Sequence, residues 1–85
     1  MEIEEIKIYT KEFCPNCEIL KEYLIEHDIV YQEYNLDDSD VIAELMADMV
    51  FIAYAPVLKI GEEYYYDNSL FEGGKLNSVV IDRLG

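Results

Sequence analysis

The residue pair best suited to chemistry in this sequence is Cys14 and Cys17, which Pro15 and Asn16 separate. They are the chain's two cysteines, and they follow an apolar run typical of a strand. Cysteines three positions apart on the first turn of a helix lie on one side of it, within bonding reach. A disulfide between them closes a very small ring and adds little stability. We therefore expect the pair to serve redox chemistry.

The expected position of Cys14 at a helix N-terminus predicts a reactive thiolate. Pro15 suits the first helical position, because its missing N–H would have no partner there. Helix N-termini have free N–H groups and partial positive charge, and both lower the pKa of a thiol. Cys14 is therefore the predicted nucleophile. Cys17, one turn further along, is predicted to resolve the mixed disulfide that Cys14 forms.

Two other interpretations of the pair are a metal site and unreactive core thiols. A structural zinc site needs about four protein ligands, and besides the cysteines the chain has only His27, about three turns down the same helix. We expect His27 to lie at the helix end as a favourable cation and not as a catalytic base. The chain therefore has too few ligands for a zinc site of its own, and we expect no metal. Pro15 places the pair at the start of a helix, so we do not expect buried inert thiols either.

Size, composition and charge limit the class of protein. The 85 residues suit one domain, residues 1–85, and the 52% that are apolar allow a modest core. With one cysteine pair, no recognisable signal peptide and no apolar run near 20 residues, we expect a cytoplasmic monomer without membrane segments. The net charge of −13 disfavours nucleic acids and anionic membranes as partners. Lys11 is either a binding cation beside the motif or a solvated surface lysine.

Hydrophobic periodicity predicts the elements that position the pair. Alternation of apolar and polar residues and enrichment in β-branched and aromatic residues predict strands at residues 5–9, 29–34, 57–60 and 63–66. Apolar residues three or four positions apart predict helices at residues 15–27, from an N-cap at Asp38 or Ser39 to residue 49, and at residues 76–84. Residues 67–69 are predicted to form a turn. The order strand–helix–strand–helix–strand–strand–helix predicts an α/β fold whose first two strands are parallel.

The apolar segment at residues 49–55, which ends at Pro56, has two interpretations. The favoured one is buried packing between a helix and a strand. The other is an apolar docking surface for partner proteins.

Over its whole length the sequence resembles the glutaredoxin branch of the thioredoxin-like fold. The resemblance rests on Tyr9-Thr10-Lys11 before Cys14-Pro15-Asn16-Cys17, on the strand that starts at Pro56, and on Gly73-Gly74 before the last helix. It implies a four-stranded mixed sheet in the order second, first, third and fourth strand, flanked by three helices. It also implies a cis bond before Pro56, facing the cysteine pair.

The resemblance further implies a substrate-binding surface. In relatives the backbone of the residue before this proline, here Ala55, pairs with the substrate, and such a contact suits many protein sequences. Relatives that use glutathione bind it with the lysine before the motif, with the backbone before the proline and with polar residues after the glycine pair. The positions expected to contact substrate are Lys11, Pro15, Asn16, Tyr54, Ala55, Pro56, Gly73, Gly74 and Asn77.

Three departures from the family pattern bear on the electron donor. Asn16 stands where Tyr is frequent, Ala55 where Val is usual, and Lys75-Leu76-Asn77-Ser78 where an acidic pair is common. They favour a thioredoxin-reductase-type flavoprotein over glutathione. The predicted function is thus reduction of protein disulfides without a bound cofactor. The alternatives are a glutathione-dependent glutaredoxin, a carrier that bridges a [2Fe–2S] cluster between two protomers, and a redox-inert adaptor.

Overall fold

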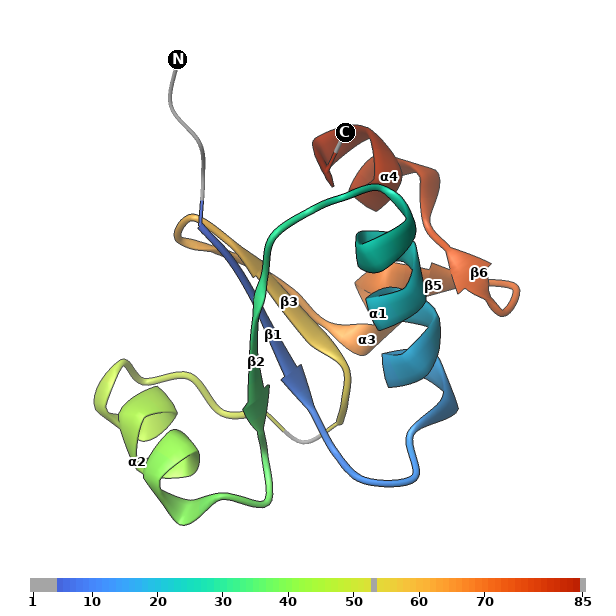
Figure 1. Ribbon diagram of the computed structural model, residues 1–85. Helices are drawn as coiled ribbons and strands as arrows, with labels where there is room; N and C mark the ends of the chain where they lie inside the picture. The colour runs from blue at the N-terminus through green and yellow to red at the C-terminus, as the bar shows by residue number, and fades with distance from the viewer. Residues whose placement is uncertain (1–4, 53, 85) are drawn as a thin grey trace.

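A four-stranded mixed sheet lies at the centre of the computed structural model, which describes residues 5–52 and 54–84 (Figure 1). Its strands are β1 (Ile6–Thr10), β2 (Gln32–Asn35), β3 (Val57–Ile60) and β4 (Glu63–Tyr65). Their order across the sheet is β2-β1-β3-β4. β1 is parallel to β2 and antiparallel to β3, which is antiparallel to β4. The sheet order and the strand directions that were predicted are therefore confirmed.

Helices cover both faces of this sheet (Figure 1). The helices are α1 (Pro15–Glu26), α2 (Ser39–Ala47), α3 (Asp67–Leu70) and α4 (Ser78–Leu84). α1, α3 and α4 pack on one face, whereas α2 packs alone on the other. In the part of the chain that the structure describes, no helix is long and apolar enough to cross a bilayer.

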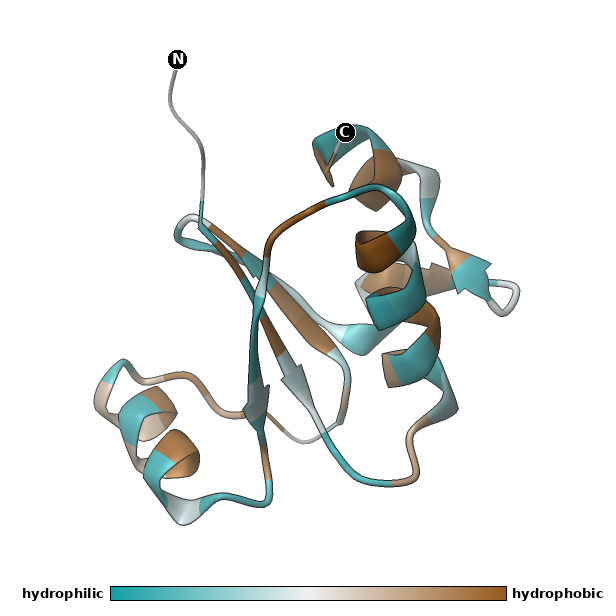
Figure 2. Ribbon diagram, viewed as in Figure 1, coloured by the Kyte–Doolittle hydropathy of each residue, from teal (hydrophilic) through white to brown (hydrophobic). Residues whose placement is uncertain are grey.

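The core has two halves, one on each face of the sheet. Ile8 of β1 and Leu58 of β3 belong to the larger cluster under α1, α3 and α4. Their neighbours Tyr9 and Val57 belong to the smaller cluster under α2. Successive residues of a strand point to opposite faces, so each of these strands supplies both clusters. Figure 2 shows brown segments in both β1 and β3.

Local chemistry explains where the two long helices begin and end. Cys14 caps α1 with its side chain, and Pro15 takes the first helical position, as predicted. Asp38 caps α2, because its Oδ1 accepts the Asp40 N–H at 2.9 Å. The second strand starts later than predicted, at Gln32 and not at residue 29. The Ile29 N–H still donates to the Leu24 carbonyl at 2.9 Å, so this residue closes the end of α1.

The segment after α2 divides between the two interpretations given to it. α2 ends at Ala47 and not at residue 49, because the Val50 N–H donates to the Leu45 carbonyl at 2.8 Å and closes the helix end. Val50, Ile52 and Ala55 pack against the cluster under α2, as the packing interpretation predicts. Met49, Phe51 and Tyr54 are exposed instead.

The C-terminal third differs most from expectation. Residues 67–69, predicted as a turn, belong to the short helix α3, so four helices and not three lie among the described residues. Gly73 and Gly74 form the tip of an antiparallel hairpin of β5 (Phe71–Glu72) and β6 (Lys75–Leu76). Both have positive φ, at 61° and 79°, and tight hairpin turns require this at two successive residues. α4 then starts at Ser78, because the Asn77 side chain accepts the Val79 N–H and caps it.

Candidate active site

Cys14 and Cys17 are joined by a disulfide at the N-terminus of α1. The Cys14 Sγ also accepts the backbone N–H of Cys17 at 3.1 Å. This is the N-cap position that the sequence predicts, where free N–H groups and the helix dipole favour negative charge. Cys14 is half-buried, whereas Cys17 has an exposed fraction of only 1%. An external disulfide can therefore reach Cys14 but not Cys17.

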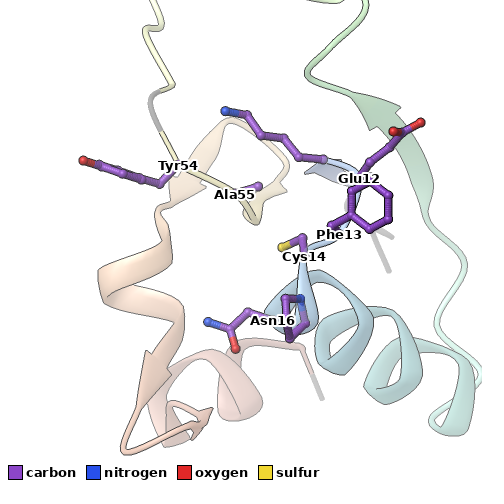
Figure 3. A pocket seen from close by; sticks show the side chains of 8 residues that line it. Glu12, Phe13, Cys14, Asn16, Tyr54 and Ala55 are labelled. Atoms are coloured by element: carbon purple, nitrogen blue, oxygen red, sulfur yellow. The ribbon is translucent and has the colours of Figure 1, made fainter.

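The loop before β3 lies across from the cysteine pair. The Ala55–Pro56 peptide bond is cis, as the resemblance implies. Between this loop and the start of α1 is a pocket of about 360 Å³ (Figure 3). Its lining consists of Lys11, Glu12, Phe13, Cys14, Pro15, Asn16, Tyr54 and Ala55.

The structure brings together only part of the predicted substrate surface. Lys11, Pro15, Asn16, Tyr54 and Ala55 line the pocket with Cys14, and the buried Pro56 follows them directly. Their part in substrate binding stays a prediction.

The glycine pair and Asn77 are placed elsewhere. Gly74 lines a second pocket, beside Ile19 and Tyr23 of α1. The Asn77 side chain caps α4. The cause is the hairpin of β5 and β6, which inserts between α3 and α4 and carries the two glycines at its tip.

Two residues of the pocket, Glu12 and Phe13, were not among those predicted to bind substrate. Phe13 is 98% exposed and has φ of 55°, a left-handed conformation that is an outlier for a bulky residue. A large apolar residue directly before Cys14, in an otherwise polar loop, is the sequence signal that could have identified it.

A polar contact anchors the strand that leads into the cysteine loop. The Thr10 hydroxyl is buried and donates to the Glu33 Oε2 of β2 at 2.8 Å. The Lys21 Nζ of α1 lies 3.4 Å from the same oxygen. Thr10, Glu33 and Lys21 thus connect β1, β2 and α1 close to the site.

Two carboxylates lie close to the cysteine pair in the chain, Glu12 in the pocket lining and Glu18 on the first turn of α1. The carboxylate of Glu18 forms an ion pair with Lys21 at 3.1 Å. The hydrogen bond to Glu18, above all, raises the pKa of Lys21.

Burial, above all, raises the pKa of Tyr9 to about 12, so its hydroxyl stays protonated. Among residues 5–52 and 54–84, no group of three His, Cys, Asp or Glu side chains could hold a metal ion.

We expect the thiol of reduced Cys14 to titrate below the ordinary cysteine pKa of about 8.5. The reason is the Cys17 N–H, which donates to the Cys14 sulfur and stabilises the thiolate. The measurement is the ultraviolet absorbance of the thiolate against pH in the Cys17→Ala variant, which keeps the backbone N–H. The same variant unfolded in denaturant is the control. A folded-state pKa at or above that of the unfolded chain would refute the expectation.

A protein-family model and two glutaredoxin-like proteins match the sequence of this chain. The Glutaredoxin family model matches residues 6–65. The glutaredoxin-like proteins NrdH of Lactococcus lactis subsp. cremoris (strain MG1363) and of L. lactis subsp. lactis (strain IL1403) are each 36% identical over 53 residues, which are 62% of this chain and 72% of theirs.

Solved structures agree with these matches. The thioredoxin-like protein BC3987 superposes with a TM-score of 0.70 at 23% identity, over 95% of this chain and 100% of its own. Glutaredoxin 1 from Francisella tularensis, solved with cacodylate, gives a TM-score of 0.55 at 28% identity, over 72% of this chain and 79% of its own. The first likeness shows a thioredoxin-like fold, as predicted.

Proposed function

Because the chain belongs to the glutaredoxin family and has a Cys14–Cys17 pair that supports thiol–disulfide oxidoreductase activity, we propose that it reduces protein disulfides and is regenerated by a thioredoxin-reductase-type flavoprotein. The observation that carries the proposal is the position of the pair. The accessible sulfur of Cys14 caps α1 and opens into a pocket, while the buried sulfur of Cys17 lies bonded behind it.

The proposed reaction is a dithiol exchange in two steps. In the first, the Cys14 thiolate attacks one sulfur of the target disulfide, forms a mixed disulfide and expels the other target sulfur as a thiolate. In the second, the Cys17 thiol loses its proton and its sulfur attacks Cys14. The Cys14–Cys17 bond forms and the second target thiolate leaves. Two electrons pass to the target and two protons come from solvent, so no bound cofactor is needed.

The pocket supports protein substrates. Its lining consists of the cysteine loop and of Tyr54 and Ala55 from the loop across from it (Figure 3). We propose that an extended segment of the target pairs with the backbone of Ala55, which leaves its side chains unrestricted. A chain of 85 residues with one cysteine pair suits a reducing compartment, so we propose that it acts in the cytoplasm, as a monomer.

The charges around the pocket support a flavoprotein donor over glutathione. Glutathione carries two carboxylates, and Lys11 is the one cation among the lining residues, which also include the acidic Glu12. Lys75 and Asn77, which belong to the polar stretch after the glycine pair that relatives use for glutathione, lie outside this lining. With a net charge of −13, the protein also repels anions over longer distances.

An insulin-reduction assay with alternative donors tests this proposal. We expect turnover with NADPH and thioredoxin reductases, and turnover at least about tenfold slower with glutathione and glutathione reductase, which corresponds to about 1.4 kcal/mol or more of barrier. The Cys14→Ser variant with each donor gives the background. Equal or faster turnover with glutathione would assign the chain to the glutathione-dependent enzymes instead.

A further inference from the structure

Large apolar side chains stay exposed between α2 and the active site. Met49 is 79% exposed and Phe51 is 70% exposed, and Met46 at the end of α2 is exposed as well. Val50 and Ile52, which alternate with them, pack inward. Figure 2 shows this stretch as a largely brown connection between α2 and β3. Folding explains the inward residues but not the exposed ones.

The backbone conformation of Met49 is unusual as well as the exposure of its side chain. Met49 has φ of 60°, the left-handed conformation in which helices commonly end and for which glycine is the usual residue. Asp28 occupies the corresponding place after α1 with φ of 53°, and Asp is a residue type that tolerates it. Met49 is therefore unfavourable both for its backbone and for its exposure to water. Residues that break local rules in this way cluster at functional sites.

A small groove lies beside these residues. It has a volume of about 120 Å³, enough for one aliphatic side chain. Its lining consists of Ile42, Leu45, Met46, Val50, Phe51 and Ile52. The chain segment that supplies the groove is strongly acidic, because residues 36–58 contain five carboxylates and no Lys, Arg or His. The carboxylates are Asp37, Asp38, Asp40, Glu44 and Asp48. Such a groove complements an apolar side chain that is flanked by cations.

Along the chain, the groove lies close to the active-site pocket. Phe51 lines the groove, and Tyr54, three positions later, lines the pocket that contains Cys14. Three residues span at most about 11 Å of extended chain. A substrate segment that pairs beside Ala55 therefore reaches the groove about four residues away from its own disulfide.

We propose that this groove is a docking site for protein substrates with an aliphatic side chain between lysine or arginine residues, close to the disulfide that Cys14 attacks. The proposal rests on the proposed function and adds a substrate class to it. Docking increases the affinity for such substrates and leaves the sulfur chemistry unchanged. Met46, which lines the groove, suits this task, because its flexible thioether adapts to differently shaped partners.

Three synthetic peptides test the substrate class. Each has an internal disulfide and, about four residues away, the sequence Lys-Leu-Lys, Lys-Ser-Lys or Glu-Leu-Glu. We expect the KM of the Lys-Leu-Lys peptide to be about tenfold lower than that of either other peptide, at similar kcat. The preference over Glu-Leu-Glu should shrink as ionic strength rises. Equal KM values for the three peptides would overturn the proposal.

Paired variants test the site. Met49→Gly with Phe51→Ser removes both exposed side chains, and the glycine suits the left-handed backbone, so the fold is preserved. We expect it to raise the KM of the Lys-Leu-Lys peptide about tenfold, to the value of the Lys-Ser-Lys peptide. Val79→Ser, which removes a 66% exposed apolar side chain on α4, is the matched control and should change nothing. Glu44→Gln should raise KM about twofold to threefold, whereas Glu72→Gln on β5 should not.

A small disulfide separates this proposal from the proposed function. Reduction of bis(2-hydroxyethyl) disulfide should be the same in the wild type and in Met49→Gly/Phe51→Ser. If the wild type did not reduce bis(2-hydroxyethyl) disulfide, the proposed function itself would be contradicted. An unchanged KM of the Lys-Leu-Lys peptide in the double variant would overturn the docking site alone. Size-exclusion chromatography gives a further outcome that would overturn it. If the wild type were a dimer and Met49→Gly/Phe51→Ser a monomer, the groove would be the contact with a second copy of the chain.

Discussion

Replacement of Cys14 by serine is expected to reduce the turnover of protein disulfides by a factor on the order of 10³ or more, the size of loss that removal of a nucleophile produces in enzymes. The Cys14 sulfur lines the pocket and accepts the Cys17 N–H, whereas Cys17 is 1% exposed and cannot replace it. A serine hydroxyl at the N-cap preserves the helix start. Activity should therefore fall without loss of fold, measured by insulin reduction and by circular dichroism.

Replacement of Cys17 by serine should stop the reaction after its first step. Cys14 still attacks the target disulfide, but no second sulfur is present to release it, so the mixed disulfide accumulates. Mass spectrometry of the variant after incubation with an oxidised substrate detects the adduct at Cys14, and the Cys14→Ser variant is the control. An adduct at Cys17 in Cys14→Ser, with none in Cys17→Ser, would reverse the roles assigned to the two cysteines.

The cysteine motif illustrates what short stretches of sequence can predict. The alternation in residues 5–9, the proline after Cys14 and the apolar spacing of residues 15–27 are all local signals. They were sufficient for the strand, the cap and the helix, which the structure has as Ile6–Thr10 and Pro15–Glu26. The sheet order joins strands far apart in the chain, such as β1 and β3, and no local pattern determines it. The sheet order was predicted from the resemblance to glutaredoxins instead.

The C-terminal third depends on long-range contacts, and there the sequence predicted less. The side chain of Leu70 is buried in the larger core cluster, and the Asn77 N–H donates to its carbonyl at 2.7 Å. These contacts close the hairpin of β5 and β6 and hold α3 against β3. Residues 67–69, which look like a turn locally, are therefore helical. The two glycines at the tip of the hairpin, and Asn77 after it, are not in the lining of the pocket that contains Cys14.

Periodicity did not identify which apolar residues are exposed, although an apolar docking surface at residues 49–55 was one of the two interpretations. Periodicity assigned Met49 to the apolar face of the second helix, but α2 ends at Ala47 and the left-handed backbone turns Met49 outward. Phe13, also left-handed, is nearly fully exposed. Periodicity treats every apolar residue as a candidate for the core. It therefore hides the residues whose side chains face water, such as Phe13 in the lining of the active-site pocket.

α1 serves the core and the active site at once. Its first turn holds both cysteines, while Leu20 and Leu24 on its inner face are fully buried against the sheet. The stability of the helix, and so the position of the Cys14 cap, depends on this packing more than on intrinsic helix propensity. Neighbouring residues of α1 offer a direct comparison, because Leu20 is buried whereas Ile19 is 37% exposed.

Replacement of Leu20 by alanine is expected to lower the free energy of unfolding by about 2–5 kcal/mol, because it removes buried methyl groups and leaves a cavity among Ile8, Leu58 and Val80. For a domain of this size the midpoint of thermal unfolding should fall by roughly 10 °C or more. Ile19→Ala should cost less than about 1 kcal/mol, since its side chain is partly in water already. Urea unfolding of the oxidised proteins measures both. Equal losses for the two variants would mean that α1 is not held by its buried face.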